Sequence, residues 1–326
     1  MKLIFACLLF IFSYSAFCQS KDSLSGIDYF FTPSDSLSGS RISTVGAATS
    51  TVFFGMMVTL DQAWYVDFKR GPFHFYQDGD EWLQVDKVGH AWTSYHGARL
   101  GDAMLKWAGV EDSKARWYGA PLGFVFLTGI EVLDGFSEEW GFSPTDMIAN
   151  TAGTGLFLGQ DLLWNEQRIQ FKYSIEPVDY LSHPEVQARI EDVYGTGIQK
   201  LLKDYNAQTY WLSVNPSDFL DEHSKFPQWL NASVGYSADG MLGGRLNSWC
   251  DDPDIKPEDC PFNQRIDFSD QVSRERQFFL SADIDLTKIE TKSPALRTLF
   301  GTLNMIKIPA PALEISDGEI HLRPLR

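Results

Sequence analysis

The sequence predicts an α+β protein, in which a Gly-rich bundle of about four helices is followed by an amphipathic helix and a strand-rich C-terminal part. Three observations support this fold class. Uncharged, glycine-spaced stretches fill residues 42–60 and 117–130, a pattern typical of closely packed helices. Residues 184–202 carry apolar side chains at helical spacing. Residues 277–286 alternate apolar and polar side chains, as a strand does.

The N-terminal residues predict export. Lys2 precedes an apolar run from Leu3 to Phe12, which is too short to be a confident membrane span. Ala16-Phe17-Cys18 offers small residues at the positions that a signal peptidase reads, so residues 1–18 are a predicted signal peptide. Ordinary cleavage leaves a mature chain that begins near Gln19, and lipidation of Cys18 is the alternative.

Residues 19–41 are rich in Ser and Asp and are predicted to be a linker, and residues 42–166 form the predicted bundle. The uncharged stretch 42–60 is long enough for either a buried helix or a membrane span. The other three helices are expected at about 86–108, 113–134 and 143–164. Ser143-Pro144-Thr145-Asp146 marks the last start, because Ser suits the cap and Pro the first turn.

The sequence pattern changes after the predicted bundle. Residues 167–225 are predicted to be an amphipathic helical segment, interrupted around Gly195–Gly197. Residues 226–326 are predicted to be rich in strands, and the strands are expected at 231–236, 277–286, 305–308 and 319–322.

Charge and cysteine content narrow the functional classes. The 326 residues carry a formal net charge of -16, with a pI near 4.7. This argues against a nucleic-acid partner, which needs a basic face, and against electrostatic adhesion to anionic lipid. Cys250 and Cys260 bracket an acidic loop and are expected to form a disulfide in an exported protein. Metal binding by these two thiols is the alternative.

The predicted glycine-rich helices contain charged and amide residues. Burying such groups is costly unless they pair with one another. Asp86 and His90 are four residues apart, Glu131 and Asp134 three apart, and Asp146 and Asn150 four apart, so each pair shares a helix face. We therefore expect one polar cluster, which is also the candidate site. Its predicted members are Asp86, Lys87, His90, Glu131, Asp134, Asp146 and Asn150.

The cluster allows two hypotheses, a structural one and a functional one. In the structural one, Lys87 pairs with Glu131 or Asp146 and His90 pairs with Asp134, and the ion pairs fix the packing of the bundle. In the functional one, His90, Glu131 and Asp134 are candidate ligands of a divalent metal, or His90 acts as a base oriented by Asp86. The chain has no Gly-x-Ser-x-Gly, His-Glu-x-x-His or phosphate-binding loop, so the catalytic residues remain unassigned.

Three motifs carry a resemblance to a known family. They are Asp86-Lys87-x-x-His90, a helix that ends in Glu131, and Gly-Phe-Ser143-x-x-Asp146-x-x-x-Asn150-x-x-Gly153. Over about residues 80–165 this order resembles the YfiM-like family of predicted periplasmic lipoproteins, whose function is unknown, and it is similar to the VanZ-like membrane family. The resemblance implies a lipoprotein of the periplasm.

We therefore expect an exported, membrane-associated envelope protein of the periplasm or outer membrane of a Gram-negative bacterium. Its polar cluster is expected to have a structural or lipid-binding role. The alternative is a metal-dependent or His/carboxylate hydrolase that acts on an envelope lipid or glycan. The expected partner is a membrane lipid or an envelope component, and no nucleic acid. No cofactor is evident beyond a divalent metal, and the sequence leaves the oligomeric state open.

Overall fold

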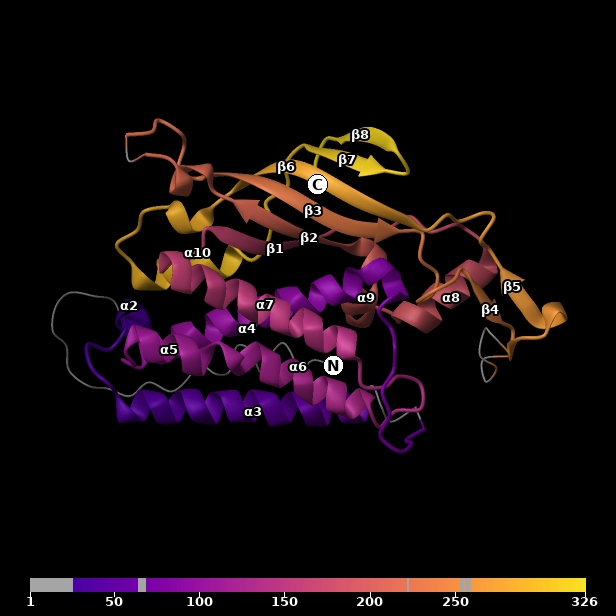
Figure 1. Cartoon of the computed structure of the whole chain (residues 1–326), viewed down its shortest axis with the longest axis horizontal. Coiled ribbons are helices and arrows are strands. Elements are labelled where there is room, and N and C mark those ends of the chain that lie inside the picture. The colour runs from indigo at the N-terminus through magenta and orange to yellow at the C-terminus, as the bar shows by residue number, and fades with distance from the viewer. Residues whose placement is uncertain (1–25, 64–68, 222, 253–254, 256–258) are drawn as a thin grey trace.

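The computed structural model of the chain describes residues 26–63, 69–221, 223–252, 255 and 259–326. The predicted signal peptide, residues 1–18, and the lipidation alternative at Cys18 lie outside these residues. A layer of helices lies beneath a curved antiparallel sheet, with α3 on the side of the bundle away from the sheet (Figure 1). The predicted α+β class is confirmed.

The bundle and its flanking helices contribute α2 Gly26–Phe31, α3 Gly39–Ala63, α4 Val85–Trp107, α5 Asp112–Gly119, α6 Pro121–Asp134 and α7 Pro144–Trp164. Later helices are α8 Pro184–Tyr194, α9 Ile198–Lys203 and α10 Pro294–Leu303. The strands are β1 Ile169–Ile175, β2 Gln208–Val214, β3 Leu230–Asp239, β4 Ser248–Cys250, β5 Arg265–Asp267, β6 Glu275–Ile284, β7 Ala312–Ser316 and β8 Glu319–Arg323.

Helix α4 is the centre of the bundle and packs against α5, α6, α7 and the first three strands of the sheet. Glycines let its neighbours approach backbone to backbone. A Cβ atom on Gly97 would lie 2.3 Å from the Cα of Gly123 in α6, and one on Gly153 in α7 would lie 2.0 Å from the carbonyl oxygen of Ala91. Both distances are far below van der Waals contact, so these two crossings require glycine.

Two expectations about the N-terminal half were wrong. The stretch predicted as one helix over 113–134 is divided into α5 and α6, because Pro121 lacks the N–H that a helix interior needs and takes the first helical position instead. The predicted linker 19–41 contains α2 and the start of α3. Arg41 fixes this start by donating hydrogen bonds to the carbonyl oxygens of Thr32 and Trp107, both at 2.8 Å.

The main sheet has the strand order β1-β2-β3-β6-β7-β8, and every neighbouring pair is antiparallel. The predicted boundary between helical and strand-rich parts was wrong, since β1 and β2 lie within residues 167–225 beside α8 and α9. β7 was not predicted. The strand expected at 305–308 is reduced to an isolated bridge between Ile306 and Tyr173.

The sheet turns an apolar face outward beyond the edge of the bundle. The alternation predicted for residues 277–286 is present in β6, but Phe278 and Leu280 are about half exposed, whereas Phe279 and Asp283 are buried. Near the bundle the same apolar face is covered, because Phe171 and Tyr210 pack with α4 and α7 in the main core. The opposite face buries an ion pair, with Lys172 Nζ 2.6 Å from Asp283 Oδ2.

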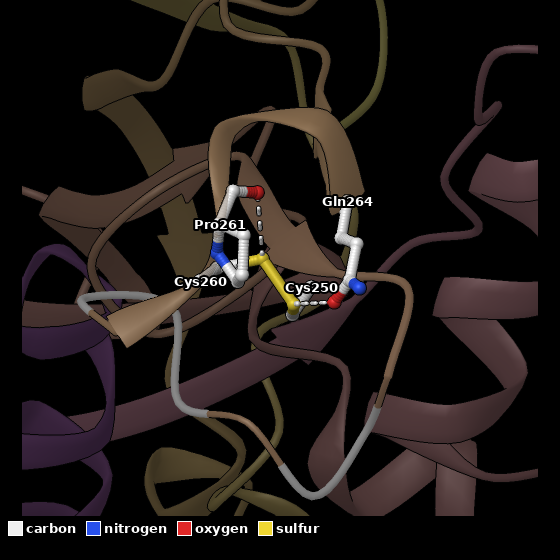
Figure 2. Close-up of a disulfide and its surroundings, with 4 residues drawn as sticks. All are labelled: Cys250, Cys260, Pro261 and Gln264. Carbon is white, nitrogen blue, oxygen red and sulfur yellow. Dashed lines mark hydrogen bonds between the residues drawn. A yellow bond between two sulfur atoms is a disulfide. The ribbon is translucent and has the colours of Figure 1, made fainter.

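A small hairpin-like sheet of β4 and β5 projects from this region and carries the predicted disulfide. Cys250, at the end of β4, is bonded to Cys260, and both are buried (Figure 2). The pairing predicted from the acidic loop is therefore confirmed.

One helix among the described residues is long and apolar enough to cross a membrane, judged by length and composition alone. It is the segment Gly39–Gln62 of α3, and no part of its most apolar stretch is buried.

Candidate functional site

Three helix ends converge at one end of the bundle and bring the predicted polar residues together. The first two turns of α4 supply Asp86, Lys87 and His90, the last turn of α6 supplies Glu131, and the first two turns of α7 supply Asp146 and Asn150. Four of these six side chains are buried, and those of Lys87 and His90 are partly exposed. The expected convergence is therefore present for these six residues, and from here on the polar cluster means these six together with Asp78.

Lys87 is the hub of the polar cluster. Its Nζ lies 2.6 Å from Asp78 Oδ2, 2.9 Å from Asp86 Oδ2 and 2.9 Å from Asp146 Oδ1. The predicted Lys87–Asp146 pair is present, and the ammonium group lies among three carboxylates.

Asp78 is the member that the sequence reasoning missed. It lies in the loop before α4. The hydroxyls of Ser143 and Thr145 donate hydrogen bonds to its Oδ1 at 2.6 and 2.7 Å. The start of α7 thus positions this loop carboxylate, a long-range contact for which the local sequence carries no signal.

His90 forms the partly open edge of the polar cluster, with 22% of its side chain exposed. Its Nδ1 lies 3.1 Å from Asn150 Oδ1 and 3.9 Å from Glu131 Oε1, and its Nε2 lies 3.8 Å from Asp146 Oδ1. Since an amide oxygen can only accept, the contact to Asn150 places a hydrogen on Nδ1.

The start of α7 is capped from two sides. As predicted, the Ser143 hydroxyl accepts a hydrogen bond from the amide N–H of Asp146, at 3.0 Å. The amide N–H of Ser143 donates to Glu131 Oε2, also at 3.0 Å. In an ordinary capping box the third residue of the same helix makes this second contact, whereas here a residue of α6 does.

The predicted ligand set His90, Glu131 and Asp134 differs from the geometry. The residues whose ligand atoms lie within 4.8 Å of one another are His90, Glu131 and Asp146. Asp134 is half-buried at the last position of α6, and its negative charge helps to raise the pKa of Glu131. Spacing placed Asp134 on the same face as Glu131, but the carboxylate that completes this set is that of Asp146, from α7.

The electrostatics reflect a shortage of positive charge. Burial, reinforced by the charge of Asp146, raises the pKa of Glu131 to about 9. Burial also raises the pKa of Asp86 to about 7, against the attraction of Lys87, and raises the pKa of Asp146. For Asp78 the hydrogen bonds from Lys87 and Ser143 outweigh burial and lower its pKa. For Lys87 burial alone would lower the pKa, but the carboxylates raise it.

Stability should therefore fall as the pH rises from about 5 to about 9. The folded chain holds a proton on Glu131 that the unfolded chain releases near its ordinary pKa of 4.5. This proton therefore contributes least to the free energy of unfolding at high pH. Asp86 and Asp146 act in the same direction. Glu131→Gln keeps the acceptor for the Ser143 amide but does not ionise, so its free energy of unfolding should depend less on pH.

Chemical denaturation across this pH range, with a chelator present, measures the effect. Glu290→Gln, at an exposed glutamate, is the control and should keep the slope of the wild type. An unchanged slope in Glu131→Gln would show that Glu131 does not hold the proton.

Taken together, the fold and the site define a helical bundle with a polar cluster at one end, joined to an antiparallel sheet. Residues 74–159 match the model of a family described as predicted periplasmic lipoprotein (DUF2279). The match spans about a quarter of the chain and includes every member of the polar cluster. It supports an exported, periplasmic protein, as the N-terminal sequence predicts. No curated protein and no solved structure matches the chain. The similarity to VanZ-like proteins stays a prediction.

Proposed function

We propose that this protein is an exported envelope protein that associates with a lipid membrane through the outer face of its helical bundle, and that the polar cluster holds the bundle together. The observation that carries the proposal is α3, whose 24-residue segment Gly39–Gln62 is apolar and unburied. At 1.5 Å per residue, such a helix is about 36 Å long, enough for the roughly 30 Å hydrocarbon core of a bilayer.

The side chains of α3 divide into two sets. Phe53 and Met57 face α6, where they would lie 3.2 and 3.3 Å from a Cβ atom on Gly129. Phe54 and Val58 point away from the bundle and are 65% and 54% exposed. A surface of this kind is unusual for a protein surrounded by water, and it supports contact with lipid or with another apolar partner.

Neighbouring elements add to this apolar surface. Val125 and Val132 are exposed on α6, which packs beside α3. Because the chain is strongly acidic, the attraction to a membrane is apolar rather than electrostatic. Location at the outer membrane belongs to this proposal too, since export alone leaves both faces of the periplasm accessible.

The contacts of the polar cluster favour a structural role over the alternative of a His/carboxylate hydrolase. Lys87 is held by three carboxylates, and Glu131 is engaged by the amide of Ser143. Side chains committed to one another in this way fix the packing of the helices.

Fractionation of a Gram-negative host that expresses the full chain tests the membrane proposal. We expect the wild type in a membrane fraction that resists washing at alkaline pH. The double variant Phe54→Asp/Val58→Asp should move substantially to the soluble periplasm, because each acidic residue costs about 2.5–3.5 kcal/mol at the centre of a bilayer. The matched control is Phe262→Asp, since Phe262 is 95% exposed in the turn between β4 and β5.

A wild-type protein found in the soluble periplasm would contradict the proposal. So would a double variant that stays in the membrane fraction as firmly as Phe262→Asp does.

A further inference from the structure

Two groups of side chains in the polar cluster have the composition and spacing of metal ligands. One is Asp78, Asp86 and Asp146, and the other is His90, Glu131 and Asp146. The first group already surrounds a cation, because Lys87 Nζ lies within 2.9 Å of all three carboxylates. The second group shares Asp146 with the first and adds an imidazole to two carboxylates.

The tautomer of His90 leaves a lone pair directed into the second group. With Nδ1 donating to Asn150 Oδ1, the neutral ring has its lone pair on Nε2. That nitrogen lies 3.8 Å from Asp146 Oδ1, which can also only accept. A cation between these two atoms would serve both of them, in addition to the Lys87 ammonium group that lies 2.9 Å from the same oxygen of Asp146. An ion about 2.1 Å from each atom spans this distance.

Asn150 provides a second, independent observation. The residue is fully buried, its Oδ1 contacts His90, and its Nδ2 has no hydrogen-bond partner. A buried amide donor without an acceptor is rare and costs about 1–3 kcal/mol. A water or hydroxide carried by a metal ion at His90 would supply an acceptor beside this amide. The Nδ1–H contact is the usual support of a metal-binding histidine.

The charge balance points the same way. Asp78, Asp86, Asp146 and Glu131 supply four carboxyl groups, against which the described residues place one ammonium group, that of Lys87, and the imidazole of His90. Buried carboxylates in excess must be protonated or paired with a further cation.

We infer that His90, Glu131 and Asp146 bind one divalent transition-metal ion where α4, α6 and α7 meet, with Asn150 orienting His90. One imidazole and two carboxylates suit Zn²⁺ and also Mn²⁺. Two ligands of one tetrahedral ion lie about 3.4 Å apart at bond lengths of about 2.1 Å. The observed spacing of up to 4.8 Å therefore needs only small side-chain movements. The partly exposed edge of His90 gives the ion an entry path.

Metal analysis of the purified full-length chain tests this inference. The protein is stripped with a chelator, equilibrated with Zn²⁺ or, separately, Mn²⁺, and freed of excess metal, and the bound metal is measured by elemental analysis. We expect about one equivalent on the wild type, and at least tenfold weaker binding by His90→Ala. Asn150→Ala should weaken binding by about 10–100-fold, as the loss of a residue that supports a ligand does.

His321→Ala is the control, because His321 is an exposed histidine on β8 and should bind as the wild type does. Circular dichroism of each variant establishes that it is folded. A wild type that takes up neither metal overturns the inference, and so does equal uptake by the wild type, His90→Ala and Asn150→Ala. The first of these outcomes does not depend on the folding of any variant.

Discussion

Replacing Lys87 with Met is expected to lower the free energy of unfolding by about 3–5 kcal/mol, the cost of leaving buried charges without their partner. The apolar stem of Met fills much of the space of the Lys side chain, so the loss is mainly that of the ammonium group. Asp78, Asp86 and Asp146 would then face one another at close range, and each would have to take up a proton or draw in water.

Chemical denaturation of the detergent-solubilised protein measures this loss, and Lys114→Met is its matched control. Lys114 is paired with Glu111 on the surface, where both side chains are 65% exposed, so the same substitution should change stability by less than about 1 kcal/mol. If both variants lost the same small amount, Lys87 would not be the hub of a buried network. The variant should also be most destabilised at high pH, where the carboxylates are ionised.

Gly153→Ala should have the second large effect, a loss of about 3 kcal/mol, at the upper end of the range for overpacking. The new methyl group would meet the carbonyl oxygen of Ala91 at 2.0 Å. Because this oxygen belongs to the backbone of α4, the clash is relieved only if α7 moves away. That movement would also separate Asp146 from Lys87.

Gly155→Ala on the same helix provides the control with the opposite sign. A Cβ atom there meets nothing within 4 Å, so this substitution should stabilise the helix by about 0.5–1 kcal/mol. Thermal unfolding of the two variants side by side compares them directly. A Gly153→Ala variant as stable as Gly155→Ala would mean that α4 and α7 do not touch at this point.

The sequence predicted those parts of the fold that depend on local signals. The cap at Ser143 and the proline at the first turn located the start of α7, and charge spacing located the faces that form the polar cluster. Pro121 also marks the boundary between α5 and α6, but the prediction followed the surrounding uncharged stretch and placed one helix there. Local sequence signals were therefore sufficient to locate these helix ends.

Other features depend on contacts that no local signal carries. Asp78 joins the polar cluster because Ser143 and Thr145 hold it, and these residues lie more than 60 positions further along the chain. Alternation in β6 defined two faces but not which one is covered, since that depends on how far the bundle extends beneath the sheet. The predicted ligand set named Asp134, whereas the set in the structure contains Asp146, because the way in which the three helices meet is not encoded by spacing along one helix.

The glycine contacts of α4 have a consequence for the chemistry at its end. Where two backbones touch, no side chain can rearrange to let the helices slide, so the carboxylates are held by main-chain contact rather than by the apolar residues around them. Changes in those apolar residues should leave the spacing of the acidic groups intact. The bundle should therefore tolerate substitutions of its apolar core residues, but not added side-chain atoms at the glycine contacts between α4 and its neighbours.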